Sequence, residues 1–168
     1  MTTATTRTAP RRRLARRPRA SLRAAHLVLA IGWTGLSMVM LVLPATVLVQ
    51  GAGTAFAVPA MGLVGGVIIP FFAVGTVLTG AALGIGTAWG LFRYRWVVVK
   101  TVLALTVIVG SVVLNTGWID AAGRDPSLLW PLLFSSALHQ VMLLSASVLS
   151  VEKPWGRIRT LTGNRLVA

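Results

Sequence analysis

Four long apolar tracts alternate with short polar or basic segments along the chain. They cover about residues 24–49, 58–84, 95–115 and 128–151. A bilayer core about 30 Å thick needs about 20 consecutive apolar residues per helix, and each tract approaches or exceeds that length. The pattern predicts an all-α polytopic membrane protein, folded as a single bundle of four transmembrane helices.

The second tract is longer than one straight span, because apolar residues continue from Pro59 to Phe92. Either a tilted helix kinked at Pro70 ends near Gly84 and leads to an interfacial turn, or the tract is two short segments. We prefer the kinked helix and leave open whether residues 85–95 are helix or interfacial loop. Glycines at 62, 66, 75, 80 and 84 permit close helix contact, so this helix is expected at the centre of the bundle.

Basic residues gather on one predicted side of the membrane. The chain has 16 Lys and Arg against 3 Asp and Glu, a formal net charge of +13. Eight basic residues precede the first tract, three lie at 93–100 and four follow the fourth tract, whereas the other side keeps only Arg124. The positive-inside rule therefore places both termini in the cytoplasm, with the protein in the plasma membrane. This distribution accounts for the charge without nucleic acid.

Both ends of the chain are predicted to be basic cytoplasmic tails. Residues 1–23 are rich in Arg, Thr, Ala and Pro without an apolar period, which is typical of a disordered segment. Residues 152–168 form the second tail, and both are expected to contact anionic lipid headgroups. The first apolar tract is too long for a signal peptide, so it is expected to be retained as a transmembrane helix.

A short basic and aromatic stretch joins the second and third tracts. It contains Trp89, Arg93, Arg95 and Trp96. Tryptophan rings and cations favour the headgroup layer of a bilayer. These four residues are therefore predicted to form an interfacial hinge on the cytoplasmic side.

Ionisable side chains inside the apolar tracts are the main candidates for function, because charge is costly at membrane depth. His139 lies near the middle of the fourth tract, with Ser135, Ser136 and Met142 on the same helical face. It is either a metal, haem or proton site, or it makes an interhelical hydrogen bond to a hydroxyl group.

Lys100 and His26 lie nearer the predicted cytoplasmic surface. The long side chain of Lys100 can extend to the headgroups, and it is otherwise a candidate for the inner mouth of a transport path. His26 is expected to be a solvated interfacial residue. With Ser135 and Ser136 these two residues make up the candidate intramembrane polar site.

Residue content excludes or disfavours several kinds of chemistry. Cysteine is absent, so disulfides and thiolate sites are excluded. Motifs of hydrolases, zinc peptidases and P-loop NTPases are missing, and no enzyme activity is expected. A copper site from His139 and Met142, with a methionine at 38, 40 or 61, matches soft-ligand preference. A haem bridging His26 and His139 is disfavoured, because the two differ in depth by roughly 15 Å.

The order of several motifs resembles a family of uncharacterised, predicted integral membrane proteins of actinobacteria, over about residues 25–150. The similar residues are His26 with Gly32-Trp33, Pro70, Leu78-Thr79-Gly80, and the run from Thr87 to Lys100. The His of the first helix, the Thr-Gly pair and the Lys that opens a later helix are more distantly similar to the copper-resistance D membrane domain. That resemblance implies a role in copper uptake or tolerance.

Three functions are open from the sequence, and we prefer the first. The first is a non-enzymatic scaffold or partner subunit without a cofactor, whose partner is another membrane protein or a second copy of the chain. The second is a copper-handling or small-solute transport protein that uses His139 and Met142, with Lys100 at the inner mouth. The third is a haem-binding electron-transfer protein.

Overall fold

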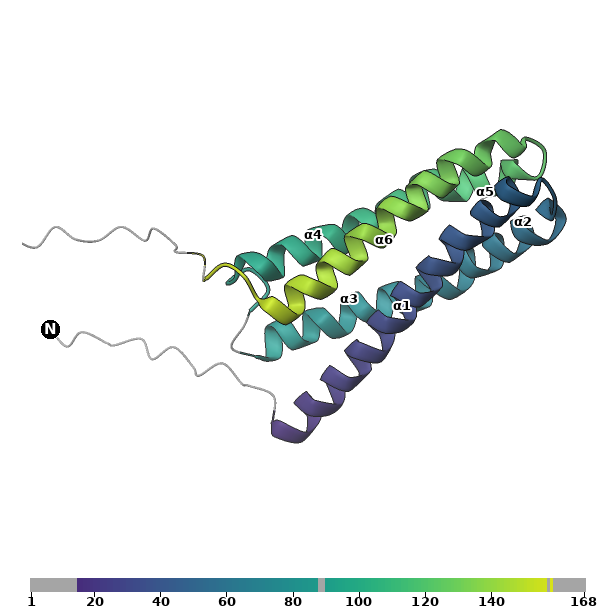
Figure 1. The fold of residues 1–168 in the computed structure, drawn as a ribbon. Helices are drawn as coiled ribbons and strands as arrows, with labels where there is room; N and C mark the ends of the chain where they lie inside the picture. The colour runs from purple at the N-terminus through teal and green to yellow at the C-terminus, as the bar shows by residue number, and fades with distance from the viewer. Residues whose placement is uncertain (1–14, 88–89, 157, 159–168) are drawn as a thin grey trace, which may run out of the picture.

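The computed structural model describes residues 15–87, 90–156 and 158, and the regular elements in those ranges are helices (Figure 1). In chain order they are α1 (Arg16–Gln50), α2 (Thr54–Leu63), the π-turn η1 (Val64–Ile68), α3 (Ile69–Gly86), α4 (Arg95–Gly110), the π-turn η2 (Ser111–Asn115), α5 (Thr116–Ala122), the 3₁₀ turn η3 (Pro126–Leu128) and α6 (Leu129–Glu152). They join into four helices long and apolar enough to cross a membrane: Arg16–Gln50, Thr54–Gly86, Arg95–Ala122 and Pro126–Glu152. The all-α class and the predicted number of spans are confirmed.

The first and third spans extend beyond their predicted limits. The first begins at Arg16, so residues 16–23 are helical, and the prediction of a disordered tail is wrong for them. Pro18 lies in the first turn, where backbone N–H groups have no partner within the helix, and the Arg, Ala and Leu residues after it favour helix. The third span continues through α5 to Ala122. Residues 1–14 and most of the predicted C-terminal tail lie outside the described residues.

The second span is one helix that passes through a π-turn. In η1 the Ile69 N–H donates to the Val64 carbonyl, five residues back instead of four. Pro70 follows. In a regular helix its ring would clash with the carbonyl four residues earlier, and the wider turn avoids this clash. Of the two alternatives for this tract, the structure has the single helix interrupted near Pro70. It ends at Gly86, and residues 87 and 90–94 are not helical.

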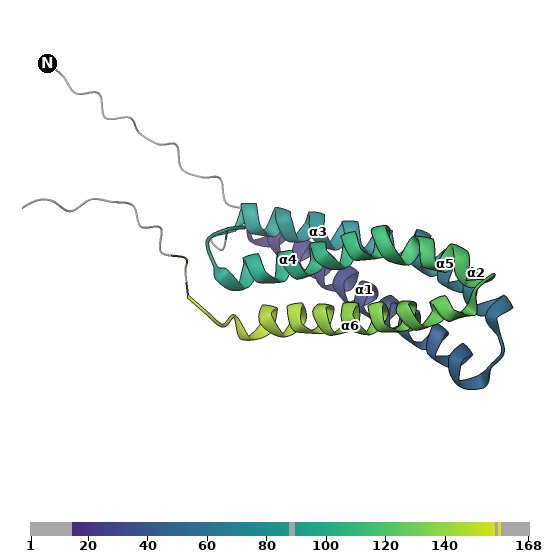
Figure 2. The ribbon, with the colours of Figure 1, turned by 90° about the horizontal axis from the view of Figure 1, so that it is seen from above.

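The first and fourth spans are the most buried of the four. Within the most apolar 18 residues of each span, 22% of the residues are buried in the first span and 28% in the fourth, against 11% in each of the second and third. α1 packs along α3 and α6, and α6 packs along α4, whereas α3 and α4 have little contact (Figure 1, Figure 2). The prediction that the glycine-rich second helix forms the centre is therefore wrong. A Cβ added at Gly62 or Gly66 would meet nothing within 4 Å, because these glycines border a cavity.

Two apolar clusters connect the spans. One lies toward the α1–α2 and α5–α6 connections and includes Met40, Met61, Ile119 and Leu132. The other, which we call the Trp33 cluster, consists of Trp33, Ala73, Val107 and Leu143, one side chain from each span. In a bilayer such close packing, more than exclusion of water, holds helices together. The Trp33 cluster therefore fixes the relative positions of all four spans.

The two ends of the bundle differ in charge. α1 begins and α6 ends at one end, the terminal end, which also holds the 87–94 connection (Figure 1). There the Ile158 N–H donates to the Arg93 carbonyl at 2.9 Å. The opposite end, the hairpin end, carries the 51–53 and 123–125 connections. Of the cations in the described ranges, only Arg124 lies at the hairpin end.

Candidate functional site

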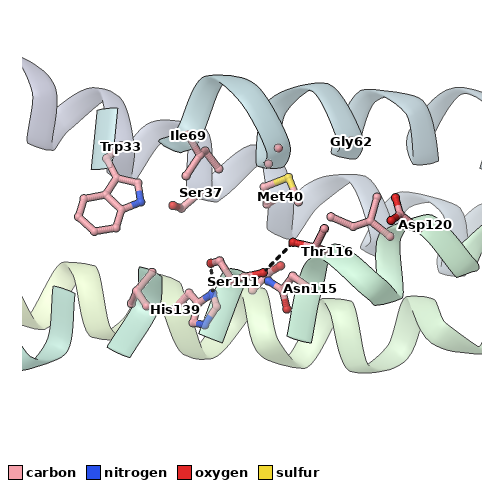
Figure 3. Close-up of a pocket in the computed structure, with 15 residues that line it drawn as sticks. Trp33, Ser37, Met40, Gly62, Ile69, Ser111, Asn115, Thr116, Asp120 and His139 are labelled. Atoms are coloured by element: carbon pink, nitrogen blue, oxygen red, sulfur yellow. Dashed lines mark hydrogen bonds between the residues drawn. The ribbon is translucent and has the colours of Figure 1, made fainter. Parts of the chain in front are cut away.

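A cavity of about 150 Å³, the His139 cavity, lies among the spans (Figure 3). Its polar wall consists of Trp33 and Ser37 from α1, Ser111 and Asn115 from η2, and Ser136 and His139 from α6. Thr116 and Asp120 of α5 border it toward the hairpin end, and Asp120 is exposed. The cavity therefore extends from the middle of the bundle toward that end.

Both π-turns border this cavity, through Gly65 and Gly66 of η1 and Ser111 and Asn115 of η2. In η2 the Thr116 N–H donates to the Ser111 carbonyl, again five residues back. A π-turn shifts the register of the side chains that follow, and such turns are frequent at functional sites. The two wide turns face each other across the cavity, where regular helices would present a different set of side chains.

Two buried polar atoms in the cavity wall have no hydrogen-bond partner among the described residues. They are Trp33 Nε1 and Ser136 Oγ, in residues that are each 2% exposed. A buried polar group without a partner costs about 1–3 kcal/mol, so such groups normally have water or a ligand beside them. The cavity is large enough for several water molecules or one small molecule. It is therefore suited to a hydrogen-bonding guest.

His139 is held between the third and fourth spans. Its Nδ1 lies 3.4 Å from Ser111 Oγ, which is a long hydrogen bond, and the residue is 8% exposed. A Cβ at Gly110 would lie 3.0 Å from His139 Nε2, so the ring rests against the bare backbone of α4. The contact with Ser111 is the interhelical hydrogen bond that one interpretation of His139 predicts.

The residues predicted to act with His139 do not all share its cavity. Ser136 lines the cavity, whereas Ser135 donates to Asn115 Oδ1 at 2.8 Å. Met142 packs against the Trp33 cluster instead of lining the cavity. Of the other methionines considered, Met40 lines it, Met38 is exposed and Met61 is buried in the other cluster.

His139 and Met40 are the soft metal donors that line this cavity. Among the described residues, no group of three or more His, Asp or Glu side chains is placed to hold a metal ion. His26 and His139 line different cavities, so one group cannot bind both. The copper and haem interpretations stay predictions.

A second cavity of about 440 Å³, the His26 cavity, extends to the terminal end. His26 Nδ1 lies 3.1 Å from the Thr76 carbonyl oxygen and 3.0 Å from Thr79 Oγ1. A carbonyl can only accept, so the hydrogen is assigned to Nδ1. His26 thus joins α1 to α3 and is half-buried, whereas the sequence predicts a solvated interfacial residue.

Lys100 also lines the His26 cavity. Its Nζ donates to Ser150 Oγ at 3.4 Å and lies 5.3 Å from the centre of the Trp96 ring. The ammonium group therefore lies between α4 and α6.

The predicted interfacial hinge is divided in the structure. Arg93 and Arg95 are exposed, as headgroup contacts require, whereas Trp96 is only 7% exposed. Trp89, the fourth residue of that prediction, lies outside the described residues.

Trp33 lines both cavities. Val107 borders only the His139 cavity and Leu143 borders only the His26 cavity, and both belong to the Trp33 cluster. This apolar cluster is therefore the boundary between a cavity with neutral polar walls and a cavity with basic walls.

Several polar residues that line the two cavities were not among the sequence candidates, including Ser37, Thr76, Ser111 and Asn115. Thr79, which contacts His26, was not a candidate either. The signal for Asn115 is an amide at the end of an apolar tract, and the signal for Thr79 is its place in the Thr-Gly motif. Hydroxyls within helices usually bond to their own backbone, as Thr34 does to Ala30, so they are weak signals of a site.

No family model, curated protein or solved structure matches this chain. The resemblance to an actinobacterial membrane family and to the copper-resistance D domain therefore stays a prediction. Function has to be inferred from the geometry of the two cavities.

Proposed function

We propose that this chain is a multi-pass protein of the plasma membrane that binds a small uncharged polar solute in the His139 cavity and transports it. The observation that carries the proposal is the pair of unpaired polar atoms in the cavity wall, Trp33 Nε1 and Ser136 Oγ. Within an apolar bundle such atoms are costly unless a hydrogen-bonding guest occupies the cavity.

The terminal end is assigned to the cytoplasm. All cations of the described ranges except Arg124 belong to that end, and the positive-inside rule favours this orientation. The His139 cavity then faces the outside of the cell, with Asp120 at its mouth, and the His26 cavity faces the cytoplasm.

The cavity wall favours an uncharged solute with hydroxyl or amide groups. Serine hydroxyls, the Asn115 amide and the His139 ring supply both donors and acceptors. Among the described lining residues, the one carboxylate is Asp120, at the exposed mouth. A volume of about 150 Å³ suits a molecule of about six non-hydrogen atoms, the size of glycerol.

Transport requires the Trp33 cluster to open, because this cluster separates the two cavities. The π-turns η1 and η2 are the places where the second and third spans can change register by exchanging one backbone hydrogen bond. Closure at Trp33 supports a gated carrier more than an open channel.

The test is solute permeability of liposomes that contain the purified protein. After a hyperosmotic shock with glycerol, light scattering reports how fast the vesicles regain volume. Protein-containing vesicles are expected to recover faster than protein-free vesicles with glycerol or urea, but not with a hexitol, which is too large for the cavity. Ser136→Leu fills the cavity and is expected to abolish the difference.

The matched control is Ser145→Leu on the exposed face of the same helix, which is expected to keep wild-type permeability. Circular dichroism and gel filtration establish that both variants are folded. Equal recovery with and without wild-type protein would reject the proposal and favour the scaffold or partner-subunit role. Equal permeability of Ser136→Leu and wild type would reject the His139 cavity as the route.

A further inference from the structure

The His26 cavity has a basic rim at the terminal end. Arg23 of α1, Lys100 of α4 and Lys153 after α6 all line it, together with His26. Three spans thus contribute a cation to one space of about 440 Å³.

Among the described residues that line the cavity there is no carboxylate. The sequence has only three, and Asp120 and Asp125 belong to the hairpin end. Glu152 is exposed and does not line the cavity. The positive charges of the rim therefore attract an anion from outside the chain.

Lys100 is held by neutral partners inside this cavity. The hydroxyl of Ser150 accepts its hydrogen bond at 3.4 Å, which is long, and the Trp96 ring lies on another side. An ammonium group is costly at membrane depth, and pairing with an anion reduces that cost. A phosphate group in the rim would accept stronger, charge-assisted hydrogen bonds than the serine does.

Much of the lining of the cavity is apolar. Its side chains include Leu27, Val77, Leu83, Leu91 and Leu143. Because α3 and α4 have little contact, the hydrocarbon chain is expected to reach these side chains from the bilayer between them. A ligand with a phosphate at one end and acyl chains at the other matches both parts of the cavity.

We propose that the His26 cavity binds one anionic phospholipid, with its phosphate between Lys100 and Arg23 and an acyl chain along the apolar wall. This site lies on the other side of the Trp33 cluster from the His139 cavity, and the test of lipid binding does not depend on transport of a solute. The site differs from contact of the basic tails with a membrane surface, because it depends on a cation placed between two helices.

The test uses the full-length protein in a neutral detergent and native mass spectrometry, which counts bound lipids. Phosphatidylglycerol and phosphatidylcholine with identical acyl chains are titrated separately. Wild type is expected to bind one phosphatidylglycerol more tightly than phosphatidylcholine. Lys100→Gln is expected to weaken phosphatidylglycerol binding roughly fivefold, with phosphatidylcholine unchanged.

Two further variants complete the design. Lys100→Arg keeps the charge and is expected to restore binding, which separates a lost cation from a misfolded protein. Arg124→Gln removes a cation at the hairpin end and is expected to bind phosphatidylglycerol as wild type does. Equal binding of the two lipids by wild type, or wild-type binding by Lys100→Gln, would overturn the proposal.

A last arm distinguishes the lipid from a soluble phosphate. Phosphatidylglycerol is held at the concentration that half-saturates the site, and glycerol 3-phosphate or inorganic phosphate is then added. No displacement of the lipid is expected, because the soluble ions lack the acyl chain. Displacement by either ion would assign the cavity to a soluble phosphate compound and reject the lipid.

Discussion

Ser111 and His139 connect the third span to the fourth, with Ser111 Oγ 3.4 Å from His139 Nδ1. Ser111 is also the first residue of the π-turn η2, and its carbonyl accepts the Thr116 N–H. One residue therefore determines both the local helix register and the position of the histidine ring. The irregular backbone at Ser111 is therefore part of the candidate site.

Ser111→Ala tests the contribution of this contact. The variant removes the hydroxyl but leaves the backbone of η2, so the free energy of unfolding is expected to fall by about 1 kcal/mol or less, as for other interhelical hydrogen bonds in membranes. Reversible unfolding in mixed micelles measures it. Ser145→Ala, on the exposed face of α6, is the control. An equal loss in both variants would mean that the contact with His139 contributes nothing to stability.

His26 and Thr79 are expected to be energetically coupled. The Thr79 hydroxyl donates to the Gly75 carbonyl at 2.6 Å, so its oxygen is available to accept from His26 Nδ1 at 3.0 Å. A double-mutant cycle with His26→Ala and Thr79→Val should give an interaction free energy of about 0.5–1 kcal/mol, because valine keeps the volume but cannot accept.

The control cycle uses Thr101 in place of Thr79 as the partner of His26, because Thr101 lines the His26 cavity. The Thr101 hydroxyl donates to the Val97 carbonyl of its own helix at 2.8 Å. His26→Ala and Thr101→Val are therefore expected to be additive. Additivity in the Thr79 cycle as well would contradict the hydrogen bond between α1 and α3.

The four spans could be predicted because hydropathy over about 20 residues depends little on helix register. A buried His139 beside Ser136 follows from spacing of three and four residues in a regular helix. The π-turns could not be predicted in this way, since each adds a residue and rotates everything after it. Asn115 contributes to the His139 cavity although it ends the predicted third tract, because the span continues as a helix to Ala122.

The roles of the glycines were predicted only in part. Small residues at regular spacing indicate close packing, but the spacing does not say which glycines have a neighbour. Gly75 and Gly80 approach Leu29 and His26 of α1, whereas Gly62 and Gly66 have open space beside them. The difference depends on where α1 runs relative to the second span, and the sequence of the second span alone does not show this.

Gly32 and Gly35 are a matched pair on α1. A Cβ at Gly32 would overlap Cε1 of the Phe72 ring, whereas a Cβ at Gly35 would meet nothing within 4 Å. Gly32→Ala is therefore expected to lower the free energy of unfolding by about 1–3 kcal/mol through overpacking. Gly35→Ala is expected to raise it by up to about 1 kcal/mol, because alanine favours helix. Unfolding in mixed micelles measures both, and destabilisation by Gly35→Ala would show that this face of α1 is covered.

Asp125 begins the turn that leads into α6. Its Oδ1 accepts from the Ser127 hydroxyl at 2.6 Å and from the Ser127 N–H at 3.0 Å. These two hydrogen bonds hold the pKa of the Asp125 carboxyl below its ordinary value, and the one from the Ser127 hydroxyl contributes more than the one from the Ser127 N–H. Because the pKa is lower in the folded state, the carboxylate stabilises the fold fully above the unfolded pKa of about 3.9. That stabilisation is lost as the pH falls through the lower, folded pKa.

Asp125→Asn should therefore be less stable than wild type at pH 6, and the difference in midpoint temperature should shrink as the pH is lowered below about 4. Thermal unfolding in detergent, followed by circular dichroism from pH 6 to pH 3, measures this difference. Ser127→Ala removes the hydroxyl donor and should move the loss of stability to higher pH, because the folded pKa then rises toward its ordinary value. A constant difference between wild type and Asp125→Asn across this range would mean that the ionised carboxylate does not stabilise the start of α6.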